Sequence, residues 1–189
     1  MKRARYISMV LGMLLLVPFI ANCHLVEAAR DKSSVLLVFN DQSGRGKEER
    51  LSEIAHEVLN RKINGLYEVV DSKQAEMRLA EDSHYEEELS VLLSELEEYP
   101  ATYVVYVELL PFKQVEGFNI IWHRKKMTAN IGLRIIDKKN SKEIFRQEYN
   151  AVREDDTDYF FVGSSSMARK SLKGALFTVG EAISVHLPL

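Results

Sequence analysis

Apolar residues along this chain recur in patterns that separate strands from helices. Val35–Phe39 is an unbroken apolar run, which predicts a central strand buried on both faces. Apolar and polar residues alternate over Met127–Ile136, as is typical of an antiparallel strand with one exposed face. A turn at Asp137–Ser141 and a returning strand, Glu143–Val152, complete a predicted hairpin. Two further segments are expected to be strands, namely Tyr67–Val70 and Tyr103–Phe112.

Other segments repeat their apolar residues at helical spacing. Four helices are expected: from Leu51 to a C-cap at Asn64-Gly65, from about Lys73 behind an N-cap at Asp71-Ser72, over 85–99 as far as Pro100, and from about Ser165 to Ile183. The helix over 85–99 has a face rich in glutamate, which we interpret as solvated, since no histidine or aspartate converges with it to bind a metal. The fold class is therefore α/β with α+β character, with a single mixed sheet of about five strands in the order β-α-β-α-β-β-β-α, in which the adjacent helices from Lys73 and over 85–99 count once.

The first 28 residues resemble an export signal. Lys2, Arg3 and Arg5 precede an apolar run of 14 residues, Ile7–Ile20, which is short for a membrane span and suits the core of a signal peptide. Val26-Glu27-Ala28 offers small residues for cleavage, so we expect a signal peptide over 1–28 and a mature chain from Ala29.

Cys23 leaves an alternative open. Ile20-Ala21-Asn22-Cys23 resembles the lipobox of bacterial lipoproteins, in which the cysteine carries the lipid, although Asn22 departs from the usual Gly, Ala or Ser. In that case the signal is 1–22 and the membrane contact is a lipid on Cys23. An uncleaved anchor is a third alternative. All three predict an extracytoplasmic protein of a bacterial cell envelope or periplasm, or a secreted one.

Composition narrows the class of protein. Of 189 residues, 46% are hydrophobic and 28% charged, which suits one globular domain over 29–189. Removing three basic and one acidic residue of 1–28 from the 25 and 28 of the whole chain leaves 22 and 27, so the formal charge changes from −3 to −5. Such a chain is not expected to bind nucleic acid. A single cysteine excludes a disulfide framework and a cysteine-rich zinc site.

Motifs for catalysis are missing from the sequence. Ser43-Gly44-Arg45-Gly46-Lys47 lies between a predicted strand and helix, yet Asp41 and Glu48 stand where a phosphate-binding loop needs Gly and Ser or Thr. The histidines show no zinc-ligand spacing, and the serines after Gly163 do not form a nucleophile elbow. We therefore expect no enzyme, with no catalytic, cofactor-binding or metal-binding residues and no cofactor.

The candidate interaction surface is the segment Trp122, His123, Arg124, Lys125 and Lys126, which follows Phe118, Ile120 and Ile121. Aromatic and arginine side chains often anchor contacts, so this segment could recognise an anionic glycan, a lipid headgroup or a partner loop. The alternative is an edge strand that its charges protect from aggregation. Tyr159–Val162 is, similarly, either a loop that caps the core or a docking patch.

Several of these segments together resemble the bacterial envelope α/β domains grouped around the curli-secretion protein CsgG, the penicillin-binding-protein activator LpoB and the TolB N-terminal domain. The segments are Val35–Asn40, Leu51–Leu59, Tyr67–Asp71, Tyr103–Val107 and the hairpin of Leu133–Asp137 with Lys142–Phe145, and the resemblance covers most of 34–187. It implies a non-enzymatic protein that binds or assembles with another envelope component. This chain lacks the β-propeller of TolB and clear membrane hairpins of a pore former.

The sequence therefore predicts an exported binding or assembly module whose partner is an envelope protein or a cell-wall component. One alternative is an envelope hydrolase whose residues assemble from distant loops. Another is a homo-oligomer that serves as a subunit of a secretion-type assembly.

Overall fold

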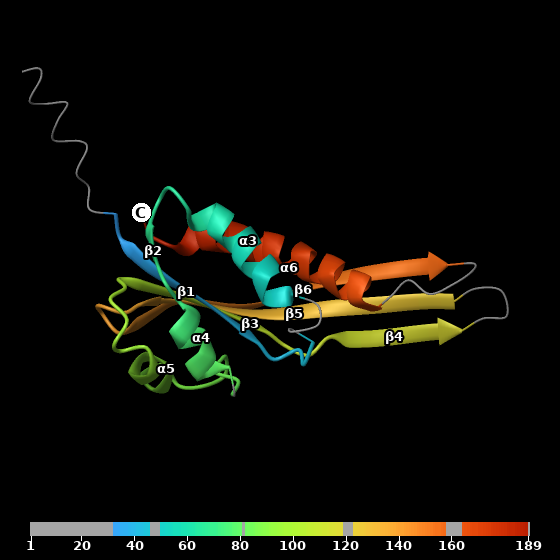
Figure 1. Ribbon diagram of the computed structural model, residues 1–189, viewed down its shortest axis with the longest axis horizontal. Coiled ribbons are helices and arrows are strands. Elements are labelled where there is room, and N and C mark those ends of the chain that lie inside the picture. Colours follow the sequence, from blue (N-terminus) through green and yellow to red (C-terminus); the bar gives the residue numbers. More distant parts are fainter. Residues whose placement is uncertain (1–31, 46–49, 81, 119–122, 158–163, 189) are drawn as a thin grey trace, which may run out of the picture. The chain divides into compact units, whose positions relative to one another are not determined.

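In the computed structural model, the residues described are 32–45, 50–80, 82–118, 123–157 and 164–188, and Ser33–Leu189 forms one compact unit (Figure 1). The expected signal peptide, Cys23, Trp122 and Tyr159–Val162 lie outside the described residues. The strands are β1 (Ser34–Asp41), β2 (Glu68–Val70), β3 (Tyr103–Leu109), β4 (Lys113–Phe118), β5 (His123–Asp137) and β6 (Lys142–Thr157). The helices are α3 (Leu51–Ile63), α4 (Lys73–Leu79), α5 (Leu89–Glu95) and α6 (Ser164–His186).

One mixed sheet organises the domain and confirms the predicted α/β class. Its order is β2-β1-β3-β5-β4, with β6 paired to β5. β1 runs parallel to β2 and β3, whereas β5 runs antiparallel to β3, β4 and β6. β6 pairs with β5 along its whole length, so β3 and β4 share the opposite side of β5.

The prediction of one strand over Tyr103–Phe112 was wrong at its end. β3 stops at Leu109, and a sixth strand, β4, starts at Lys113. Pro111 lies between them and has no N–H to donate to a ladder, which accounts for the break. β4 is largely exposed and has no clear apolar alternation, so its sequence gave little indication of a strand.

Helices cover the sheet on both faces (Figure 1). α3 and α6 pack on one face, where the core includes Leu37, Val105, Ile131 and Leu172. α4 and α5 pack on the other, around Leu36, Val104 and Leu92. β1 is buried on both faces, as its unbroken apolar run predicts. Folding buries the apolar side chains of these two layers away from water, and this hydrophobic effect is the main source of stability in such a fold.

The helix ends follow local chemistry only in part. Gly65, after α3, has φ +91, the left-handed conformation expected of a C-cap glycine. The helix expected over 85–99 is much shorter in the structure, where α5 spans only Leu89–Glu95. Tyr85 belongs instead to the connection between α4 and α5, where long-range hydrogen bonds hold the backbone.

Three strands continue past the helices α3, α4 and α5 as a β-arm, which consists of β4, residues 123–130 of β5 and residues 150–157 of β6 (Figure 1). β5 is its central strand, and β4 and β6 are its edges. α6 packs on one face of this region, through Met127, Met167 and Ala168 and through the close approach of Gly174 to Ala151. The β-arm therefore exposes more polar and charged surface than the rest of the sheet.

Candidate functional site

Four residues of the segment singled out from the sequence, His123–Lys126, begin β5, the central strand of the β-arm. Arg124, Lys125 and Lys126 belong to β5, with β4 on one side and β6 on the other, so the interpretation as an edge strand was wrong. Arg124 Nε lies 3.0 Å from Glu154 Oε1, and Lys125 Nζ lies 3.2 Å from Glu116 Oε1. Two of the cations are thus paired with carboxylates of the neighbouring strands. Trp122, and the side chain of His123, are not described.

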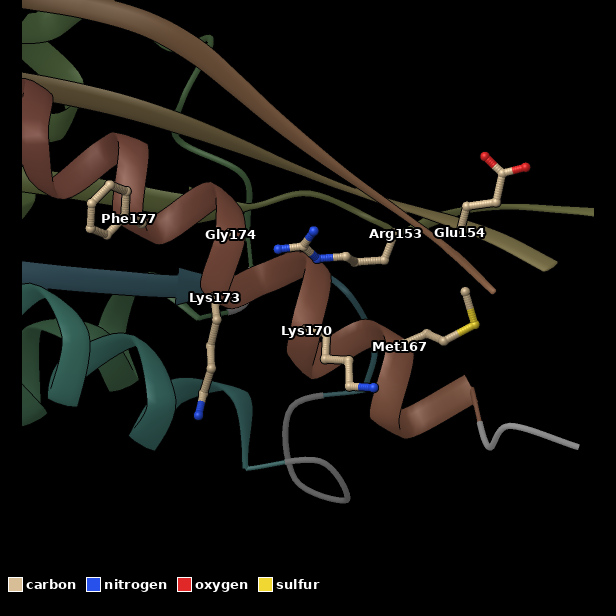
Figure 2. A pocket seen from close by; sticks show the side chains of 7 residues that line it. All are labelled: Arg153, Glu154, Met167, Lys170, Lys173, Gly174 and Phe177. Atoms are coloured by element: carbon tan, nitrogen blue, oxygen red, sulfur yellow. The ribbon is translucent and has the colours of Figure 1, made fainter. Parts of the chain in front are cut away.

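A groove between β6 and α6 gathers cations from two separate segments of the sequence (Figure 2). It has a volume of about 740 Å³ and is lined by Arg153 and Glu154 of β6 and by Met167, Lys170, Lys173, Gly174 and Phe177 of α6. Arg153 extends from the strand across α6 toward Gly174, while Glu154 points away (Figure 2). All the lining residues come from these two elements, so the groove lies between α6 and the face of β6 that carries Arg153.

Gly174 sets how closely the helix approaches the strand. A Cβ atom at this position would lie 3.3 Å from Ala151 Cβ and 3.5 Å from Arg153 Nη2. A larger side chain would therefore push α6 away from β6 or displace the guanidinium. Gly174 thus allows the side chain of Arg153 to lie on the helix.

The cations of this groove have no carboxylate partner among the described residues. Within the described part of the chain, Arg153, Lys170 and Lys173 make no ion pair with a carboxylate, whereas Glu154 pairs with Arg124. Phe177 adds an apolar surface that is 61% exposed, and Lys62 Nζ lies 5.3 Å from its ring centroid. Cations beside an exposed aromatic ring suit an anionic ligand that also has apolar groups.

No sequence signal pointed to this groove. Lys170 and Lys173 are three residues apart on a helix, which is an ordinary spacing for solvated lysines. Arg153 lies on a strand, and only the packing of α6 on β6 brings it near them. The three cations are therefore a property of the tertiary structure.

A second concave surface of about 920 Å³ lies at the carboxyl end of β1, between α3 and α4. β2 pairs with β1 only as far as Leu36, so the N–H of Phe39 has no strand partner on that side. Glu76 of α4 replaces it: its Oε1 accepts from Phe39 N at 3.1 Å and from Ser72 Oγ at 2.9 Å, and lies 2.9 Å from His56 Nε2. This carboxylate therefore ties α3 and α4 to the open edge of β1.

Other side chains that line this concave surface also have partners within the protein. Arg50 pairs with Glu53 at 2.8 Å, and the Arg45 guanidinium lies 6.0 Å from the ring centroid of Phe112. Asp41 Oδ1 accepts from Ser43 N at 2.9 Å. Asp41 and Ser43 thus form a short-range turn directly after β1.

A buried polar cluster on the face of α4 and α5 holds the connection between these helices. Glu108 is fully buried in β3, and its Oε2 accepts from the backbone N–H groups of His84, at 2.9 Å, and Tyr85, at 3.2 Å. The Tyr106 hydroxyl and Ser83 Oγ donate to the same carboxylate. Burial first, and then the hydrogen bond to Glu108, raise the pKa of Tyr106 well above its usual range.

Arg134 completes this cluster from β5. Its Nη1 donates to the carbonyl oxygens of His84 at 2.8 Å and Glu87 at 3.0 Å, and its Nε donates to Glu143 at 2.6 Å. Arg134 is 1% exposed, so these bonds satisfy a cation that water cannot reach. A charged residue inside an otherwise apolar stretch, Glu108 in Tyr103–Leu109 and Arg134 in Ile131–Ile136, was the signal that could have revealed this cluster. Its donors and acceptors are used to fix the backbone, so its role is structural.

Two kinds of functional feature are absent from the described residues. No group of three or more His, Cys, Asp or Glu side chains there is close enough to hold a metal ion. Among the helices of the same ranges, none is both long and apolar enough to cross a membrane.

No protein-family model matches this chain, and no curated protein matches it. Its fold is similar to the protein CT253 from Chlamydia trachomatis, at 14% identity, over 81% of this chain and 99% of that one, with a TM-score of 0.47. It is also similar to a minor lipoprotein from Acinetobacter baumannii (12% identity, 82% and 92%, TM-score 0.45). A third similar structure is TolB from Acinetobacter baumannii (17% identity, 82% and 28%, TM-score 0.43).

These similar structures include bacterial lipoproteins and envelope proteins, and the likeness is one of fold only. At such identities and TM-scores they assign no function to this chain. The resemblance to CsgG and LpoB stays a prediction.

Proposed function

We propose that this protein is an exported, non-enzymatic binding module of a bacterial cell envelope, and that its groove between β6 and α6 binds an acidic part of another envelope protein. The observation that carries the proposal is the set of unpaired cations, Arg153, Lys170 and Lys173, beside the exposed ring of Phe177. The export signal expected over 1–28 supports the location.

Charge supports an acidic partner. Residues 29–189 are expected to carry a net charge of −5, so the domain as a whole repels anions weakly. At physiological ionic strength, charges interact over about 8 Å, so an approaching carboxylate would respond mainly to the cations of the groove. The groove therefore favours a local acidic segment over a large polyanion that would also meet the acidic surface.

The histidines and their carboxylates argue against the hydrolase alternative. In a catalytic triad the histidine lies between the nucleophile and the acid. Here Glu76 occupies the middle position, because it accepts from Ser72 Oγ and contacts His56 Nε2. His56 is therefore turned toward the acid and not toward the hydroxyl that it would have to deprotonate. The second pair, His84 Nδ1 and Glu87 Oε2 at 2.6 Å, belongs to the connection that the buried polar cluster holds.

A binding experiment with a matched control tests the groove. The variant Arg153→Gln/Lys170→Gln/Lys173→Gln removes its three cations, and Lys113→Gln/Lys139→Gln/Lys142→Gln removes three exposed lysines elsewhere. Fluorescence anisotropy would follow a labelled 12-residue peptide with six glutamates. At about 0.5 kcal/mol for each exposed pair, the groove variant should weaken binding about 10-fold. Equal losses in both variants, or none in either, would contradict the proposal.

Export to the cell envelope needs a measurement of its own, separate from the binding experiment. Mass spectrometry of the mature chain should find an N-terminus at Ala29. A diacylglyceryl group on Cys23 would show the lipoprotein alternative instead, and an intact Met1 in the cytoplasm would refute export.

A further inference from the structure

β6 leaves a long backbone edge unpaired. It spans 16 residues and pairs only with β5 among the described strands. The carbonyl of Asn130 in β5 accepts from Leu110 N at 3.0 Å, so the backbone polar groups of Asn130 point away from β6. Asn150 lies opposite Asn130 in the antiparallel register, and its N–H and C=O therefore point outward from the sheet. By alternation, those of Val152 and Glu154 also point outward.

The side chains along this edge differ between the two faces. Arg153 lies on the face that α6 covers, where Lys170 and Lys173 are its neighbours in the groove. Val152 lies on the opposite face, where it is 42% exposed. A strand added at this edge would direct successive side chains alternately to the cations and to the face of Val152.

We propose that the acidic segment binds by strand addition to the edge of β6, with acidic and apolar residues in alternation; this inference rests on the function proposed above. Carboxylates on one face of the added strand meet Arg153, Lys170 and Lys173, and apolar side chains on the other face meet Val152. The outward N–H and C=O groups of Asn150, Val152 and Glu154 supply the backbone hydrogen bonds. An extended polypeptide is the one ligand class that uses the charges and the backbone edge together.

Charge complementarity selects this occupant over a second copy of the same chain. The β6 of a second copy would bring Glu148, Glu154 and further acidic residues, but also Arg146 and Arg153. Arg146 and Glu154 are already engaged with Glu86 and Arg124. A separate acidic strand meets only unpaired cations.

Peptides of fixed composition test the inference with the full chain. The first is an acetylated peptide of four Glu-Val repeats, and the second has the same residues with the glutamates in one block. The alternating peptide should bind at least about 10-fold more tightly, because only it places every carboxylate on one face. Two further forms carry N-methyl groups on alternate residues. One of them should lose binding about 10-fold or more and the other should not, since a strand at an edge directs only every second N–H to its neighbour.

A protein variant provides the complementary measurement. Val152→Pro removes an outward N–H that β5 does not use, so the ladder with β5 is kept and binding of the alternating peptide should fall about 10-fold. Circular dichroism checks that the variant folds, and the N-methylated peptides keep the test valid if it does not.

The outcomes separate the two proposals. If the block and alternating peptides bind equally and both N-methylated forms bind, strand addition is wrong and the acidic-partner function stands. If no acidic peptide binds, both proposals fail. A chain that sedimentation shows to be dimeric, and that Val152→Pro makes monomeric, has a second copy on this edge, which overturns the inference.

Discussion

The ring of Tyr85 packs directly over Gly132, so a side chain added at position 132 should destabilise the fold. A Cβ atom on Gly132 would lie 2.4 Å from Tyr85 Cδ2 and 2.7 Å from Cε2 and Cγ, so a methyl group at 132 collides with the ring itself. The ring has little freedom to move, since Tyr85 is 5% exposed, its N–H donates to Glu108, and the Arg146 guanidinium lies 4.7 Å from its centroid. The structure thus requires glycine at this position of β5.

The expected magnitude follows from overpacking. Forcing an extra methyl into a packed site costs about 1–3 kcal/mol, and we expect about 2 kcal/mol for Gly132→Ala because three ring atoms collide. In a domain of this size each kcal/mol lowers Tm by about 2–4 °C, so Tm should fall by about 4–8 °C. Gly117→Ala in β4 is the matched control: its Cβ would meet no atom closer than 3.9 Å, and stability should change little.

Urea denaturation of a double-mutant cycle identifies the cause. Tyr85→Ala alone should cost about 3–5 kcal/mol, as for other buried aromatic residues. In that background the cost of Gly132→Ala should fall below about 0.5 kcal/mol, which gives a coupling free energy of about 2 kcal/mol. An equal cost of Gly132→Ala in both backgrounds would show that the ring does not lie over Gly132, and the placement of Tyr85 would be wrong.

Three further changes test other parts of the fold. Glu76→Ala leaves the Phe39 N–H without its acceptor and should cost about 2 kcal/mol by urea denaturation, whereas Glu53→Ala, in an exposed pair, should cost less than about 0.5 kcal/mol. Because the pKa of Tyr106 is raised in the folded protein, the unfolded chain loses the hydroxyl proton first, from about pH 10, and the free energy of unfolding falls as the pH rises further. Tyr106→Phe should reduce this fall by up to about 1.4 kcal/mol per pH unit, measured by urea denaturation at pH 9, 10 and 11. Gly65→Ala places a side chain at φ +91 and should lower the stability by about 1 kcal/mol, which a gain in Tm would contradict.

Local sequence patterns predicted the parts of the fold that local physics determines. Val35–Phe39 is apolar at every position, and a strand buried on both faces needs no more information than that. Gly65 marked the end of α3 because a left-handed residue there favours glycine. The alternation in β5 placed Met127, Ala129 and Ile131 on one face, and all three are fully buried.

Elements determined by distant contacts were predicted less well. The stripe over 85–99 suggested one helix, but the N-terminal part of that stripe follows the hydrogen bonds from Glu108 and Arg134, which lie on other strands. Helical spacing cannot show that Glu108 and Arg134 form hydrogen bonds with the backbone of His84 and Tyr85. The tertiary contacts thus override a favourable local pattern.

The same distinction applies to the candidate site. The dense cations of Trp122–Lys126 suggested an interaction surface in the sequence, but carboxylates of β4 and β6 lie beside Arg124 and Lys125 in the β-arm. Arg153 is followed by three acidic residues in the sequence, yet it faces α6 and pairs with no carboxylate in the described part of the chain. An approaching partner is attracted by the charges that are left after these internal ion pairs have formed, so the number of cations in a sequence segment does not predict the attraction. Removing Arg153, Lys170 and Lys173 should therefore affect the binding of an acidic segment, whereas removing Arg124 should first affect the pairing of the strands in the β-arm.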